Sequence, residues 1–215
     1  MANKNTNLQN AKKVKDDEFY TRYEDIYNEV MQYKNHFDNK IVLCNCDDPI
    51  ESNFCKFFLK NFNVLNLKRL ICTTYYCAKI ASKEFEFINI EGKKNKKHGY
   101  VLDVTKFSNT KGEISDKIIS DLLKKGNCIK RLDGDGDFQS GECIDYLKLS
   151  DIVVTNPPFS LFREFVSIIT KYQKKFLIVG NQNALTYKEI FPLIKNDKIW
   201  TGFQFGEMKI RVPKS

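Results

Sequence analysis

The fold is decided by the stretch DIVVTNPPFS, which occupies residues 151–160. Its apolar run from Ile152 to Val154 contains only β-branched residues and predicts a strand buried on both faces. Asn156 and the two prolines after it predict a loop, because proline has no backbone N–H for a strand ladder. We expect Ser160 to cap a helix whose apolar side chains are Leu161, Phe162, Phe165, Val166 and Ile169.

The same alternation of strand and helix continues on both sides of this stretch. Further short apolar runs predict strands at Ile41–Cys44, Leu70–Thr73, Cys128–Leu132, Phe176–Val179 and Ile199–Phe203. Helices are expected between them, one capped by Ser52 and another around 188–194. This pattern predicts an α/β fold with a mostly parallel central sheet and helices on both faces. In such sheets, ligands bind at the carboxyl ends of the strands.

Two segments depart from this rhythm. Residues 1–15 are polar, rich in Asn and Lys, and predict a flexible basic arm. Between about 77 and 126 we expect an inserted hairpin and helix, with strands at 85–90 and 100–104. The four lysines at the hairpin tip could contact phosphate, although such a tip is more often only solvated; they are Lys93, Lys94, Lys96 and Lys97.

The composition limits the class of protein. The 215 residues suffice for one good-sized domain, and the net charge of +8 favours a polyanionic partner such as nucleic acid. Seven cysteines without a CxxC pair and only two histidines argue against a zinc site, so we expect no metal. The chain has no long apolar run and no signal-peptide pattern, and we expect a cytoplasmic protein without a membrane partner.

The loop after the 152–155 strand carries the most specific chemistry. Methylating an amine on a base requires acceptors that hold its protons and leave its lone pair directed at the methyl donor. The Asn156 side-chain oxygen and the Pro157 carbonyl, held rigid by consecutive prolines, are two such acceptors. The Phe159 ring offers a face on which a flipped-out base can stack. An ordinary turn is the alternative, because Asn and Pro are common in turns.

This loop and three other segments resemble a known family. DIVVTNPPFS resembles motif IV of amino-methyltransferases, and the other segments are DEFYT (17–21), CNCDDP (44–49) and GDGDF (134–138). Together they resemble the EcoRI-type adenine-specific DNA methyltransferase family, from about residue 16 to the end. The resemblance implies a Rossmann-like class I fold that uses S-adenosylmethionine to methylate the N6 amino group of adenine in double-stranded DNA. It also implies a restriction-modification system with a possible cognate restriction endonuclease.

The resemblance assigns roles to particular residues. The segment from Asp17 to Tyr20 matches motif X, which covers the methionine part of the cofactor, and Asp47 lies in the segment 44–49 that matches motif I, where it would contact the cofactor's ammonium group. The segment 134–138 matches motif III, in which the Asp137 carboxylate would accept a hydrogen bond from the cofactor adenine and the Phe138 ring would stack nearby. The implied cofactor-binding residues are Phe19, Tyr20, Cys46, Asp47, Pro49, Asp137 and Phe138, and the implied catalytic residues are Asn156, Pro157, Pro158 and Phe159.

Several features leave alternatives open. Asp48 and Pro49 could merely begin a helix, where an acidic side chain complements the helix dipole. The alternating aspartates of 133–137 are like the start of a calcium loop, but the required Glu would fall on Ile144. The second strand ends in Thr73-Thr74-Tyr75 rather than in an acidic residue for the cofactor ribose. Asn181 and Asn183 match a region that lines the target-base pocket in relatives.

The organisation of the chain also bears on its activity. The implied catalytic domain covers 16–215, and relatives continue well beyond this point, so we expect the target-recognition region to be missing. An RNA or protein methyltransferase with the same loop is one alternative function. A truncated, inactive remnant that binds cofactor or DNA is the other.

Overall fold

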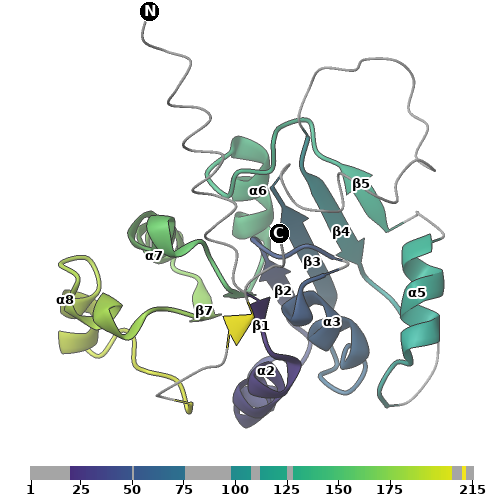
Figure 1. The fold of residues 1–215 in the computed structure, drawn as a ribbon, viewed down its shortest axis with the longest axis horizontal. Helices are drawn as coiled ribbons and strands as arrows, with labels where there is room; N and C mark the ends of the chain where they lie inside the picture. Colours follow the sequence, from purple (N-terminus) through teal and green to yellow (C-terminus); the bar gives the residue numbers. More distant parts are fainter. Residues whose placement is uncertain are drawn as a thin grey trace, which may run out of the picture.

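The computed structural model describes residues 20–49, 51–75, 98–107, 112–124, 128–204 and 210–211. Helices and strands alternate along most of this length (Figure 1). The elements are β1 (Tyr20–Thr21), α2 (Tyr23–Val30), η1 (Met31–His36), β2 (Ile41–Cys44), α3 (Asn53–Lys60), β3 (Arg69–Thr74), β4 (Tyr100–Val104), α5 (Asp116–Lys124), β5 (Ile129–Arg131), α6 (Gly141–Leu149), β6 (Ile152–Thr155), η3 (Phe159–Leu161), α7 (Phe162–Lys171), β7 (Lys175–Ile178), η4 (Gln182–Thr186), α8 (Phe191–Lys195) and β8 (Ile210–Arg211).

The central sheet has six strands in the order β5-β4-β3-β2-β6-β7. The pairs β2–β3, β2–β6 and β6–β7 are parallel, and β4 runs antiparallel between β3 and β5. From β2 the chain builds the sheet toward β5 and then returns to add β6 on the other side of β2. The carboxyl ends of β2 and β6 therefore form the topological switch point where α/β sheets bind ligands. The predicted α/β class with a mostly parallel sheet is confirmed.

Helices cover both faces of the sheet, because successive strand residues point to opposite sides. Val42 and Val154 pack with α2 and α3 in one core cluster, whereas Leu43 and Val153 pack with α6 and α7 in another. In Figure 1, β7 and α8 lie at one end of the sheet and α5 lies at the other. None of the helices in the described part of the chain combines the length and apolar character needed to cross a membrane.

The structure corrects three local predictions. Ser160 does not cap the helix, because Pro158 holds an extended backbone and the chain makes a 3-10 turn before α7 begins at Phe162. The helix expected around 188–194 is α8, which begins at Phe191 with a proline in its first turn. Residues 199–203 form no strand: the backbone N–H of Phe203 donates to the Glu29 carboxylate at 2.7 Å instead of to a strand. The Ser52 cap is confirmed.

The expected insertion is described only in part. The strand at Tyr100–Val104 forms, and as β4 it pairs with β3 and β5 in the central sheet. Its expected hairpin partner at 85–90, the four tip lysines and the arm at 1–15 lie outside the described residues. A second, two-stranded sheet joins the two ends of the described chain, because Thr21 of β1 pairs with Ile210 of β8.

Candidate active site

Two loops meet at the switch point of the sheet. The loop 45–49 follows β2, and the loop 156–158 follows β6. Because β2 and β6 are hydrogen-bonded neighbours, with Leu43 opposite Val153, the two loops emerge side by side. The structure therefore brings the predicted motif I and motif IV segments together at the carboxyl edge of the sheet.

Asp47 connects these loops through a buried hydrogen-bond network. Its side chain is 5% exposed, and its Oδ1 atom accepts a hydrogen bond from Ser52 Oγ at 2.5 Å. Its Oδ2 atom accepts one from Thr155 Oγ1, also at 2.5 Å. The backbone N–H of Asp47 donates to the Thr73 carbonyl at 3.2 Å. Asp47 thus joins the ends of β3 and β6 to the first turn of α3.

The surroundings of Asp47 disfavour its charged form. The pKa of its carboxyl is raised from 3.8 to about 6, mainly by burial and to a smaller extent by the nearby Asp48 carboxylate. The hydroxyls of Ser52 and Thr155 and the backbone N–H of Asn156 donate hydrogen bonds that lower this pKa and partly offset the burial. No cation among the described residues forms an ion pair with this carboxylate.

The predicted motif III loop reaches the same site. Burial raises the pKa of the Cys46 thiol well above its usual range, and the carboxylates of Asp47 and Asp137 raise it further, which places both near that thiol. Asp137 Oδ1 accepts a hydrogen bond from Gln139 N at 2.8 Å and so shapes its own turn. The Phe138 ring is buried and packs edge-on against Phe165, with ring centroids 5.1 Å apart.

Two glycines bring the motif III loop against the end of β3. Gly136 has a φ of +80°, and an added Cβ at this position would overlap the Thr74 carbonyl. An added Cβ at Gly99 would come within 2.5 Å of the same oxygen. Thr73 and Thr74 are buried here, beneath the motif III loop. They stand at the end of β3, where the general methyltransferase pattern has an acidic residue for the cofactor ribose.

The predicted motif X segment is described in part. Phe19 and the side chain of Tyr20 lie outside the described residues, whereas the backbone of Tyr20–Thr21 forms β1. Asn53 Nδ2, in the first turn of α3, donates to the Thr21 carbonyl at 2.8 Å. This bond places β1 beside the helix that follows the motif I loop, where Pro49 is also buried.

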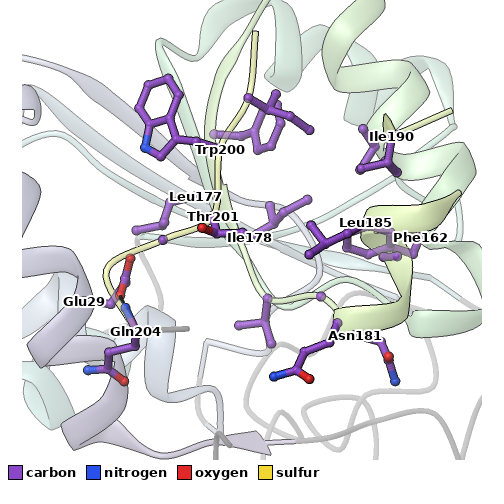
Figure 2. A pocket seen from close by; sticks show the side chains of 18 of the residues that line it. Glu29, Phe162, Leu177, Ile178, Asn181, Leu185, Ile190, Trp200, Thr201 and Gln204 are labelled. Carbon is purple, nitrogen blue, oxygen red and sulfur yellow. Dashed lines mark hydrogen bonds between the residues drawn. The ribbon is translucent and has the colours of Figure 1, made fainter. Parts of the chain in front are cut away.

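A cavity of about 560 Å³ adjoins the motif IV loop beyond β7. The Phe159 ring lines it together with Asn181 and Asn183, and most of the other lining residues are apolar. Figure 2 shows Glu29 and Gln204 on one side of this cavity and Phe162 and Ile190 on the other. Pro157 is buried, whereas Asn156, Pro158 and Phe159 are partly exposed.

One wall of this cavity is held by a second buried carboxylate. Glu29 of α2 is 7% exposed and accepts hydrogen bonds from the backbone N–H groups of Phe203, at 2.7 Å, and Gln204, at 2.6 Å. We call this arrangement the Glu29 clamp. The clamp holds the segment 199–204 in place. Trp200 belongs to this segment, is exposed, and lines the cavity.

Comparison with known proteins identifies the family. A family model described as adenine-specific methyltransferase EcoRI matches residues 7–215. The chain belongs to this family. It is 49% identical to the type II methyltransferase M.EcoRI of Escherichia coli over 208 residues, which are 96% of this chain and 58% of that relative. It is 38% identical to M.MpnI of Mycoplasma pneumoniae over 192 residues, which are 89% of this chain and 49% of that relative.

The chain therefore spans about half the length of the curated relatives that it matches. No solved structure matches it significantly. The predicted family membership is confirmed, and within it the structure gathers Cys46, Asp47, Asp137 and the motif IV loop at one edge of the sheet.

Sequence reasoning missed two residues at this site. The sequence pattern places Thr155 only in its strand, although a polar residue that ends a buried apolar run is itself a signal of a buried hydrogen bond. No local sequence pattern marks Glu29, because its partners are more than 170 residues away in the chain. Among the described residues, no group of three or more His, Cys, Asp or Glu side chains is placed to hold a metal ion.

Proposed function

We propose that this protein is a site-specific DNA methyltransferase that transfers a methyl group from S-adenosylmethionine to the N6 amino group of adenine in double-stranded DNA. The observation that carries this proposal is the meeting of the Asn156–Phe159 loop with the 45–49 loop at the switch point of the sheet. Family membership supports the choice of adenine, and the names of the relatives support a place in restriction-modification. On this basis we also propose a cytoplasmic location and a cognate restriction endonuclease.

The proposed cofactor site fits a cationic methyl donor. The overall charge of the chain is +8, yet Asp47, Asp48 and Asp137 gather at this edge of the sheet. S-adenosylmethionine, when bound, supplies an electrophilic methyl group on a sulfonium centre, and it carries an ammonium group as well. The Asp137 carboxylate would accept from the adenine amine of the cofactor. The contact of Asp47 with the ammonium group and the stacking of Phe138 stay predictions, as do the roles of Phe19, Tyr20, Cys46 and Pro49.

The motif IV loop would act on the target base. Asn156 Oδ1 and the Pro157 carbonyl would accept the two amine protons, which leaves the nitrogen lone pair free to face the methyl group. Phe159 would support the flipped base, and the cavity beside it, with Asn181 and Asn183, would receive that base. These residues position the reactants and stabilise the charge that develops on the amine, so no covalent enzyme intermediate is needed.

The experiment is to incubate the protein with labelled cofactor and separate pools of duplex DNA, RNA and protein. We expect label on adenine in DNA. Asn156→Ala should abolish turnover and leave cofactor affinity, measured by calorimetry, largely intact. Asn196→Ala, at an exposed position after α8, is the control and should retain turnover. Methylation by the Asn156→Ala variant, label in RNA or protein alone, or cofactor binding without any turnover would contradict the proposal.

A further inference from the structure

The buried carboxylate of Asp47 has more structural partners than a residue that only faces a ligand would need. Its two oxygens accept from Ser52 and Thr155, and its own N–H donates to Thr73. Ser52 is 4% exposed and Thr155 is fully buried. These bonds are therefore shielded from water, and each missing partner would leave a buried polar group unsatisfied.

The partners of Asp47 belong to the elements that carry the active site. Thr155 is the last residue of β6 and directly precedes Asn156. Ser52 caps α3, the helix that follows the cofactor loop, by accepting from Phe54 N at 3.1 Å and from Cys55 N at 3.5 Å. A shift of the Asp47 side chain would consequently move the start of the motif IV loop and the start of α3 together.

We infer that Asp47 is a positioning residue: by holding Thr155 and Ser52, its carboxylate sets Asn156 at the correct place relative to the cofactor loop. The inference rests on the proposed function, in which Asn156 receives the target amine. A carboxylate suits this role because it only accepts hydrogen bonds, so both hydroxyls must donate toward it and their orientations are fixed. Outer partners of this kind typically change activity about 10- to 100-fold when they are removed.

The charge state of Asp47 supports this role. The groups that face it are Asp48 on its own loop, Cys44 at the end of β2, Cys46 on the loop and Cys55 on α3. Burial raises the pKa of all three thiols, so they are neutral near pH 7. Protonation of Asp47 would make one of its oxygens a donor, and one of the two hydroxyls would have to turn away.

The test compares Thr155→Val, Thr155→Ser and Asp47→Asn in the full chain. We expect Thr155→Val to lower the single-turnover methylation rate about 10- to 100-fold, with less than about a threefold change in cofactor Kd. Thr155→Ser keeps the hydroxyl and should restore most of the rate. Asp47→Asn should lower the rate similarly, and adding Thr155→Val to it should cause little further loss, because both changes break the same contact.

A matched control and a second readout separate positioning from general damage. Ser150→Ala removes another buried hydroxyl hydrogen bond, to Leu147 O at 2.8 Å, just before the opposite end of β6, and should leave the rate unchanged. Hydrogen exchange of the Asn156 backbone amide, followed by NMR, should speed up in Thr155→Val and Asp47→Asn but not in Ser150→Ala. In the wild type the rate should fall as the pH drops below about 6, and Asp47→Asn should lack this fall.

Three outcomes would overturn the inference. The first is a wild-type rate in Thr155→Val. The second is a loss of cofactor affinity in Asp47→Asn with a normal Thr155→Val, which would make Asp47 a direct ligand of the ammonium group. The third is unchanged exchange of the Asn156 amide in both variants. If the wild type methylates none of the pools, the proposed function fails, and the exchange measurement still decides whether Asp47 holds the motif IV loop.

Discussion

Asp47 and Glu29 are two buried carboxylates, and they differ in the donors of the hydrogen bonds that they accept. The donors to Asp47 from Ser52 and Thr155 are hydroxyls, which can rotate and become acceptors. Glu29 accepts from the backbone N–H groups of Phe203 and Gln204, which cannot become acceptors. Removing the charge while keeping the shape should therefore have opposite effects on stability at the two sites. The comparison therefore tests whether Asp47, unlike Glu29, lowers the stability of the fold in its charged form.

Asp47→Asn should give the largest effect, and it should stabilise the fold. The rise of the Asp47 pKa from 3.8 to about 6 means that the folded state binds this proton more tightly than the unfolded state. The stability that this group contributes is therefore complete below pH 3.8 and is lost as the pH rises through about 6, a loss of about 3 kcal/mol. An amide avoids this loss at the cost of about 1 kcal/mol in poorer hydrogen bonding.

We accordingly expect Asp47→Asn to be about 2 kcal/mol more stable than the wild type at pH 7.5, with the gain absent at pH 4. Urea unfolding at the two pH values measures both differences. A variant that is less stable at pH 7.5 would show that the hydroxyls cannot reorient. A gain in stability together with the loss of rate expected above is the pattern of a functional site that trades stability for activity.

Glu29→Gln should destabilise the fold by about 1.5 kcal/mol, because its amide NH₂ would face a backbone N–H that can only donate. Trp200 is the one tryptophan of the chain and lies in the clamped segment, so its fluorescence reports on this wall directly. We expect its emission to change in Glu29→Gln and to stay unchanged in Asp47→Asn. Equal stability of Glu29→Gln and wild type would remove the distinction between the two carboxylates.

Gly202→Ala should cost about 1 kcal/mol, because an added Cβ would overlap Glu29 Oε1 and push the clamp open. The cost is modest, since the carboxylate is the flexible end of a long side chain. Gly134→Ala is the matched control: an added Cβ there meets no atom within 4 Å. Thermal unfolding of both variants checks the prediction, and an equal response in the two would mean that the contact with Glu29 is unimportant.

Trp200→Ala should have the smallest effect, below about 0.5 kcal/mol, because the indole is 77% exposed. Chemical unfolding followed by circular dichroism measures this variant, which has lost the fluorescent side chain. A large loss of stability would show that aromatic packing, rather than the Glu29 clamp, holds the segment 199–204.

The buried strands were the most predictable part of the molecule. Ile41–Cys44 and Tyr100–Val104 form where the sequence places them, because a short run of apolar residues between turn signals has few other ways to be buried. Two other local predictions, a helix cap and a strand, were wrong. Ser160 lost the capping position to a 3-10 turn, and the apolar segment from Ile199 bonds to a helix side chain instead of to a sheet.

In the candidate site, the loops were predictable from the sequence and the side-chain partners were not. Sequence patterns located the loops 45–49, 133–138 and 156–159, since each follows a predicted strand. Strands that run in the same direction place such loops at one edge of the sheet. The partners of Asp47 were not predictable, because Thr155 lies 108 residues further along the chain and its hydroxyl looks like part of a strand. The same holds for the cavity beyond β7, whose walls come from α2, α7 and the segment 199–204.

By itself, the sequence determined the α/β class, the family and the position of the Asn156–Phe159 loop directly after a buried strand, because these depend on local residue patterns and on the few conformations that proline and buried apolar runs permit. Only the tertiary structure decided that Asp47 turns inward to Ser52 and Thr155, and that Glu29 holds the chain 174 residues later. A buried carboxylate accepts hydrogen bonds from whichever donors the folded chain places beside it. The spacing of residues in the sequence does not show which donors these are.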